Sequence, residues 1–126
     1  MPRVLIVDDE ENQRRTLSIG LKLEGFDVVV AGTSVDALRV LAETPPVEVA
    51  LIDLMMPGLN GLELSRQIRT MFPSVRVVLS SAYHLSARQV ERADCGAVGF
   101  VPKPYRLAEL SSFLRAKAKT ISQTPC

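Results

Sequence analysis

Short apolar runs, each rich in valine or isoleucine, constrain the fold more than any other feature of this sequence. Four of them are clear and a fifth is weaker, and they lie at residues 4–7, 28–31, 47–52, 75–79 and 98–101. Each run is apolar on both faces, which is typical of strands that helices cover on both sides, as in parallel sheets. The sequence therefore predicts five strands in a buried parallel sheet.

Segments of helical character separate and follow these strands, at residues 11–24, 34–43, 61–71, 86–93 and 107–118. Because strand and helix alternate five times, we expect an α/β fold of the (βα)5 type, a doubly wound, flavodoxin-like sheet of order 2-1-3-4-5. The 126 residues, 47% hydrophobic and 23% charged, suit one domain with a proper core. We expect this domain to cover residues 1–119, with a polar tail at residues 120–126.

Composition argues against several functions. Fifteen basic and fourteen acidic residues give a formal charge of +1, which argues against a basic nucleic-acid-binding surface and a polybasic membrane anchor. No apolar run approaches the roughly 20 residues that span a bilayer, so a cytoplasmic location is expected. The spacing of Cys95 and Cys126 indicates neither a zinc site nor a disulfide framework.

The first predicted helix carries more apolar surface than one core-facing stripe needs. Leu17 and Leu21 share one face, whereas Ile19 and Leu23, offset by about 200°, share another. The second pair is either covered by neighbouring loops or exposed as a docking strip for a partner protein.

Polar side chains follow four of the five strands. Asp8 and Asp9 end the first strand, Asp53 the third, Ser80 and Ser81 the fourth, and Lys103 and Pro104 the fifth. In the expected strand order these four strands are neighbours, so their carboxyl ends bring the polar groups to one rim. Taken singly, Asp9 could cap a helix together with Asn12, Ser81 could cap the fourth helix, and Lys103 could be a surface lysine.

Taken together, these groups indicate a cation and phosphoryl site. Three carboxylates crowded at one rim repel one another unless a cation is present, and Mg²⁺ suits a site that has few carboxylates and several waters. Mg²⁺ and the Lys103 ammonium could then bind different oxygens of a phosphoryl group, with the Ser81 hydroxyl near a third. Asp53, alone at the end of a central strand, is the best candidate for a nucleophile that becomes an acyl phosphate.

Four segments of the chain resemble the receiver domain of two-component response regulators, the CheY-like superfamily. They read VLIVDDEE with Asp8 and Asp9, LIDLMMPGLNG with Asp53, VVLSSA with Ser81, and GFVPKPY with Lys103. Each segment alone is weak evidence, whereas all four in this order are strong evidence. The resemblance covers essentially the whole chain from residue 3 to residue 118.

The resemblance implies a site and a reaction. Asp53 would take a phosphoryl group from the phosphohistidine of a sensor histidine kinase or a phosphotransfer protein. Asp8, Asp9 and Asp53 would bind Mg²⁺ together with the backbone carbonyl of Met55. Lys103 would contact the phosphoryl group, and the peptide bond before Pro104 would be cis.

The resemblance also implies how the signal leaves the site. The Ser81 hydroxyl would move to the phosphoryl oxygen, and Phe100 would swing into the space that it leaves. The changed surface would be formed by helix 86–93, strand 98–101 and helix 107–118, and would bind a downstream effector protein or domain. A phosphorylation-dependent homodimer is a further expectation, whereas direct binding to nucleic acid or membrane is not expected. The plausible exposed contacts on the changed surface are Arg88, Glu91, Arg92, Arg106 and Glu109.

Two side chains beside the pocket bear on the lifetime of the phosphorylated state. Met55 and Tyr83 are bulky, and we expect them to obstruct the attack of water and to slow dephosphorylation. His84, alone at the start of a loop, is interpreted as a solvated side chain and not as a phosphorelay histidine.

The sequence argues against three rival functions. A flavodoxin-like electron carrier disagrees with the acidic stretch after the first strand, which would repel the cofactor phosphate. An aspartate-based phosphatase usually has a second acid at the position of Met55 in this chain. It also has a cap domain, for which this chain has no length. The third rival is a receiver-like scaffold that signals without phosphorylation. The presence of all the residues expected for phosphorylation, Asp8, Asp9, Asp53, Ser81 and Lys103, argues against it. We therefore expect no enzyme activity beyond the domain's own phosphorylation and dephosphorylation.

Overall fold

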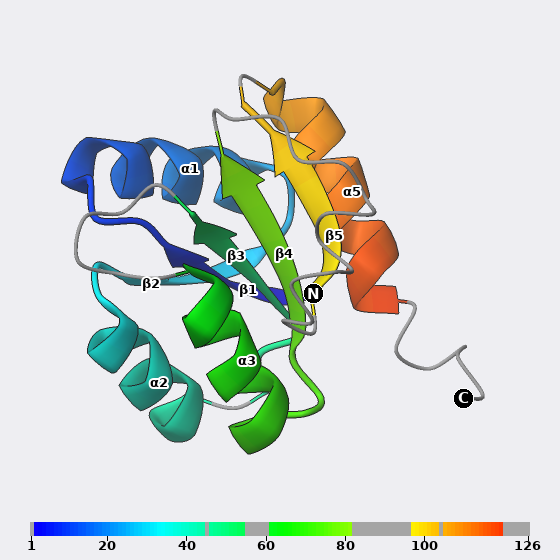
Figure 1. The fold of residues 1–126 in the computed structure, drawn as a ribbon. Helices are drawn as coiled ribbons and strands as arrows, with labels where there is room; N and C mark the ends of the chain where they lie inside the picture. Colours follow the sequence, from blue (N-terminus) through cyan, green and yellow to red (C-terminus); the bar gives the residue numbers. More distant parts are fainter. Residues whose placement is uncertain (1, 45, 55–60, 82–96, 104, 120–126) are drawn as a thin grey trace.

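A five-stranded parallel sheet of order β2-β1-β3-β4-β5 organises the chain (Figure 1). The computed structural model describes residues 2–44, 46–54, 61–81, 97–103 and 105–119. The strands are β1 (Arg3–Val7), β2 (Asp27–Ala31), β3 (Val49–Asp53), β4 (Arg76–Ser81) and β5 (Ala97–Pro102). The described helices are α1 (Glu11–Leu23), α2 (Ser34–Glu43), α3 (Gly61–Met71) and α5 (Leu107–Lys119).

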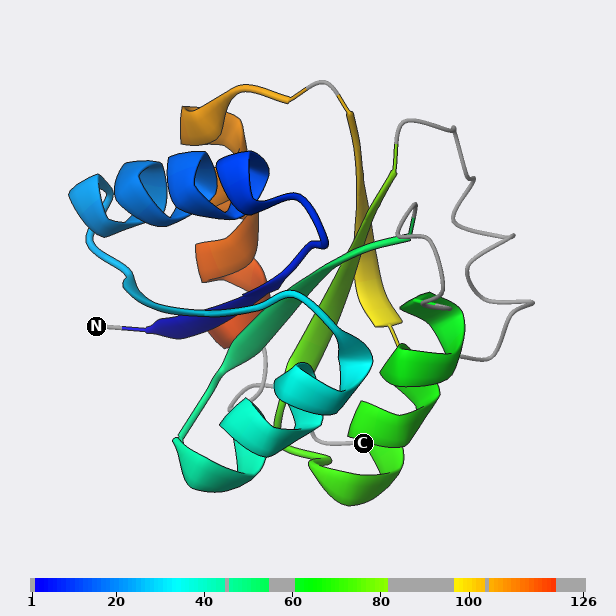
Figure 2. The same cartoon turned by 90° about the vertical axis from the view of Figure 1, so that its left-hand side faces the viewer.

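Helices cover both faces of the sheet, as the apolar runs predict. Helices α1 and α5 lie on one face, and α2 and α3 lie on the other (Figure 2). Successive side chains of a strand point to opposite faces, so each buried strand supplies both cores. On β1, for example, Leu5 and Val7 face α2 and α3, whereas Val4 and Ile6 face α1 and α5.

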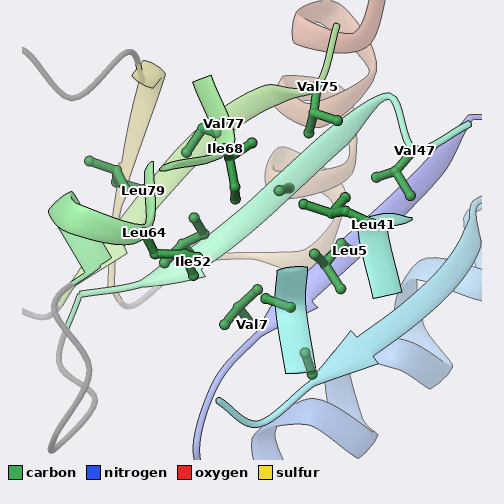
Figure 3. Close-up of a cluster of buried hydrophobic side chains, with 13 residues drawn as sticks. Leu5, Val7, Leu41, Val47, Ile52, Leu64, Ile68, Val75, Val77 and Leu79 are labelled. Atoms are coloured by element: carbon green, nitrogen blue, oxygen red, sulfur yellow. The ribbon is translucent and has the colours of Figure 1, made fainter. Parts of the chain in front are cut away.

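The core beneath α2 and α3 consists mainly of apolar side chains. Ile52 and Leu79 from the strands meet Leu64 and Ile68 of α3, and Leu41 of α2 closes the other end (Figure 3). All five side chains are at most 3% exposed. The opposite core includes Leu21 of α1 with Leu110 and Leu114 of α5, each fully buried. Burial of side chains of this size is worth about 1.5–3 kcal/mol each, so the two cores stabilise the folded sheet.

The predicted fold class and strand order are confirmed. Predicted helix ends agree with the structure to within one residue, and the fourth predicted helix, 86–93, lies outside the described residues, as does the tail at 120–126. The third strand is predicted to begin at Val47, but it begins at Val49. Val47 is buried, yet it precedes the ladder of hydrogen bonds that pairs Val49 with Val4. The fourth strand extends to Ser81, since hydrogen bonding continues where the apolar run stops.

Helix α1 separates its two apolar faces. Leu21 is fully buried and Leu17 packs against the core, whereas Ile19 is 57% and Leu23 is 83% exposed. Ile19 and Leu23 are therefore exposed, and their use as a docking strip for a partner protein stays a prediction. No helix within the described ranges is long and apolar enough to cross a membrane.

Candidate functional site

The alternation of side chains along the strands explains why acids and a serine meet at one rim. Asp8 follows Ile6 by two positions, Asp53 follows Leu51 by two, and Ser80 follows Val78 by two. Because Ile6, Leu51 and Val78 all face α1 and α5, the three polar residues continue the same face beyond the core. The strand register places Asp53 opposite Ser80. All three are buried, with exposed fractions of 2% for Asp8, 8% for Asp53 and 1% for Ser80.

Backbone hydrogen bonds extend this rim past the strands. The Asp8 amide donates to the Ala31 carbonyl at 3.1 Å, and the Leu54 amide donates to the Ser80 carbonyl at 2.8 Å. The Asp8 Oδ1 atom accepts from the Glu10 amide at 2.9 Å, which turns the chain from β1 into α1. The Arg14 guanidinium donates to the Asp8 carbonyl at 2.6 Å. The backbone that carries Asp8 is therefore fixed on several sides.

Asp8 and Asp53 form a buried pair of like charges. Burial, first of all, raises the pKa of Asp8 above its ordinary value, and the charge of Asp53 and a side-chain contact with it raise it further. The Glu10 amide and the Lys103 ammonium oppose this shift without cancelling it. A cation bound beside the pair would relieve the repulsion.

Lys103 brings a positive charge to this pair of carboxylates. Its Nζ atom lies 2.9 Å from Asp53 Oδ2 and 4.0 Å from Asp8 Oδ2. The same ammonium donates to Gln13 Oε1 at 3.0 Å. Two carboxylates and one ammonium leave a net charge of −1, and their geometry aims the lysine at Asp53.

Asp9 takes a different position from its neighbour. Its side chain is exposed, and among the residues that the structure describes no three His, Cys, Asp or Glu side chains lie together as a metal site. Asp9 does not cap α1 either, because the N-cap is Glu10, which makes no side-chain cap bond. Mg²⁺ needs only one or two carboxylates beside its waters, so the oxygen donors of Asp8 and Asp53 suit that ion.

Two polar residues of the site, Gln13 and Tyr105, escaped the sequence reasoning, which placed Ser80 at this rim but gave it no role. Burial, followed by the charges of Asp8 and Asp53, raises the pKa of Tyr105 to about 12, and an approach to Ser80 opposes the shift. That approach is looser than a full hydrogen bond, since Ser80 Oγ has no partner at hydrogen-bond geometry among the described residues. The alternation along β4 carried a signal for Ser80, whereas Gln13 lies 90 residues from its partner Lys103.

The remaining expected site residues are only partly described. The backbone of Ser81 belongs to β4, where it pairs with Pro102, and Phe100 is half-buried against the α2 and α3 core. Arg106 and Glu109 are exposed, as expected of a contact surface. Other residues named from the sequence lie outside the described part of the chain: Met55, Tyr83, His84, Arg88, Glu91, Arg92 and Pro104.

Comparison with known proteins identifies the family. The family model described as "Response regulator receiver domain" matches residues 4–115. The chain belongs to this family. Like its relatives, the receiver domain is thus a component of two-component systems. The response regulator MprA of Mycobacterium sp. strain KMS is 34% identical over 120 residues, which cover 95% of this chain and 52% of MprA. The chain therefore spans about half the length of that relative.

Solved structures agree with this assignment. A CheY-like receiver domain protein from Methanospirillum hungatei JF-1 superposes with a TM-score of 0.86 at 24% identity and 98% coverage of both chains, which supports the fold. The response regulator TrrA of Thermotoga maritima, solved in complex with Mg²⁺-BeF, has a TM-score of 0.79 and 29% identity. It covers 93% of this chain, which covers 99% of it.

Proposed function

We propose that this receiver domain is an Mg²⁺-dependent phosphoacceptor switch that takes a phosphoryl group onto Asp53. The observation that carries the proposal is the Lys103 ammonium, held 2.9 Å from Asp53 Oδ2 beside the buried Asp8 carboxylate. An ammonium at this place meets the negative charge that develops on a transferred phosphoryl group. The buried like-charged pair gives the same rim a need for a second cation.

The transfer forms one bond and breaks one. A carboxylate oxygen of Asp53 attacks the phosphorus of a phosphohistidine on the donor, a sensor histidine kinase or a phosphotransfer protein. The O–P bond forms as the P–N bond breaks, and the electron pair of that bond stays on the imidazole nitrogen. Lys103 then binds a phosphoryl oxygen, while Asp53 becomes an acyl phosphate.

Mg²⁺ would be held by Asp8 and Asp53, with Asp9 and the backbone carbonyl of Met55 as further oxygen ligands. When bound, it supplies positive charge to the phosphoryl oxygens. The complex of the relative TrrA with Mg²⁺-BeF supports this part of the proposal. The protein's own part is to keep Asp8 buried and oriented, which the Glu10 amide does through Asp8 Oδ1.

The output side of the proposal concerns the surface that includes β5 and α5. Phosphorylation at Asp53 would draw the Ser81 hydroxyl toward the phosphoryl group and Phe100 farther inward, and thus change the surface around Arg106 and Glu109. An effector protein or domain, or a second copy of the chain, would read this change. The cis peptide bond proposed before Pro104 would help direct Lys103 into the site. The domain would catalyse only its own phosphorylation and dephosphorylation, and Met55 and Tyr83 would slow the latter.

Intact mass spectrometry after incubation with acetyl phosphate tests the proposal. With Mg²⁺, the wild-type protein gains one phosphoryl group and Asp53→Asn gains none. Without Mg²⁺, in EDTA, the gain falls to background. The proposal is wrong if the mass stays unchanged in all samples, or if Asp53→Asn is modified as readily as the wild type.

A further inference from the structure

We propose that Gln13 is a positioning residue that holds the Lys103 ammonium in place over Asp53. The proposal deepens the proposed phosphoacceptor function, on which its kinetic part rests. Gln13 is the third residue of α1, and its side-chain carbonyl accepts a hydrogen bond from Lys103 Nζ at 3.0 Å. The partners come from opposite ends of the sequence, so the contact exists only in the folded chain.

The ammonium has three donors, and the structure accounts for its neighbours one by one. One proton goes to Asp53 Oδ2 at 2.9 Å and one to Gln13 Oε1 at 3.0 Å, whereas Asp8 Oδ2 is 4.0 Å away. Lysine has a flexible four-carbon stem, so two anchors fix its head far better than one. Gln13 thereby selects Asp53 over Asp8 as the carboxylate that Lys103 binds.

A neutral acceptor suits this position. A carboxylate in place of the Gln13 amide would add a third negative charge beside Asp8 and Asp53 and would compete with an incoming phosphoryl group for Lys103. An apolar side chain would leave one ammonium proton without its acceptor. In either case the lysine would be less well placed for the transferred group.

Helix α1 is held firmly enough to act as an anchor. Arg14, the next residue, donates to the backbone carbonyl of Asp8 at 2.6 Å, so the first turn of α1 is tied to the backbone that carries Asp8. Farther along, Gly20 packs so closely against Leu107 that a Cβ atom there would lie 2.7 Å from the leucine. Contacts other than the one with Lys103 therefore also hold Gln13 in its position relative to Asp8.

Gln13 also borders a cavity of about 390 Å³ that α1 shares with Lys103 and Tyr105. The cavity is lined by Asn12, Thr16 and Leu17 as well. Because Lys103 also lines this cavity, its hydrogen bond to Gln13 opposes a turn of the ammonium outward into that space. Thr16, which lines the same cavity one turn farther along α1, offers a matched control.

The first test observes Lys103 in metal-free protein, so it does not depend on phosphorylation. The ¹⁵Nζ resonance of the Lys103 ammonium, assigned by its loss in Lys103→Arg, is recorded at low temperature. We expect slow proton exchange in the wild type, in Thr16→Ala and in Gln13→Glu, and exchange faster by about tenfold in Gln13→Met, as for a lost hydrogen bond to a charged group. Unchanged exchange in Gln13→Met overturns the proposal.

The second test measures the rate of phosphorylation by acetyl phosphate at varied Mg²⁺. Gln13→Met and Gln13→Glu should each lower the maximal rate about tenfold, with half-saturation by acetyl phosphate unchanged, because positioning and not donor binding is lost. Thr16→Ala should match the wild type. Wild-type rates in both Gln13 variants overturn the proposal, whereas a wild type that gains no phosphoryl group overturns the proposed function and leaves the exchange test to decide on Gln13.

Discussion

The two ends of the sheet treat charge in different ways. At the amino end of β1, Arg3 lies between two acids: its Nε atom binds Asp27 Oδ2 at 2.6 Å, and its backbone amide donates to Glu48. These groups are partly exposed, and the guanidinium also donates to the Thr44 carbonyl at 3.3 Å. At the carboxyl end, Asp8 and Asp53 are buried together with one ammonium.

This difference agrees with the proposed binding of a ligand at the carboxyl end. The acids at the amino end keep contact with water, so their excess charge costs the fold little. The acids at the carboxyl end are 2% and 8% exposed, and burial raises the pKa of Asp8. A chain that retains buried like charges is less stable than it would otherwise be, which makes sense where a cation and a phosphoryl group are to bind.

Removing the positive charge at each end should give the largest contrast. Lys103→Met leaves two buried carboxylates without their cation and should lower the free energy of unfolding by about 3 kcal/mol at pH 7 without metal. Arg3→Met, at the exposed end, should lower it by less than about 1 kcal/mol. Urea unfolding measures both, and equal losses would contradict the comparison.

Mg²⁺ should stabilise the protein by binding at the carboxyl end of the sheet and not at the amino end. At about one hundred times its dissociation constant, Mg²⁺ should raise the free energy of unfolding by about 2.7 kcal/mol, and EDTA should reverse the effect. Asp53→Asn should lose most of this gain, whereas Asp27→Asn should keep it. Stabilisation that is the same in both variants would place the ion elsewhere.

Replacing Asp8 should reveal the cost of the buried pair. Its pKa is raised above 3.8 in the folded protein, so the fold binds its proton more tightly than the unfolded chain does. Stability due to this group therefore falls as pH rises from about 3.9 through the folded pKa. Asp8→Asn should raise the free energy of unfolding at pH 7 without metal by about 1 kcal/mol. A loss of stability at pH 7 in Asp8→Asn would show that the buried pair of carboxylates does not destabilise the fold.

The smallest effect concerns Tyr105, which senses the same charges. In a Tyr83→Phe background, absorbance at 295 nm reports Tyr105 alone. With a pKa of about 12, only about a tenth of the phenol should be ionised at pH 11. Asp8→Asn should lower this pKa yet leave it above 10.0, because burial is the largest cause of the shift. Half-ionisation of Tyr105 near pH 10 in the parent protein would show that burial and the two acids do not raise its pKa.

Much of the fold could be predicted because burial leaves a clear pattern in the sequence. The strands are covered on both faces, so their residues form continuous apolar runs, and topology then places Asp8, Asp53 and Lys103 at one rim. Strand ends were less certain, since Val47 is buried outside the ladder and Ser80 is polar inside it. An apolar run reports burial, whereas a strand is defined by its hydrogen bonds.

The fine structure of the site could not be predicted for a related reason. Asp9 and Asp8 are adjacent and chemically identical, yet only Asp8 continues the buried face of β1. Gln13 has no distinctive spacing to Lys103, and their contact depends on how α1 packs against the sheet. Side chains that meet through tertiary packing alone leave no local signal.

The central claim is that the buried acids await a cation and a phosphoryl group. A crystal structure of the protein grown with Mg²⁺ and beryllofluoride tests it most directly. Our account predicts beryllofluoride on Asp53, contacted by Lys103, with the metal ion beside Asp8. Well-ordered crystals in which both groups bind elsewhere, or in which Lys103 still contacts only Asp53 and Gln13, would contradict it.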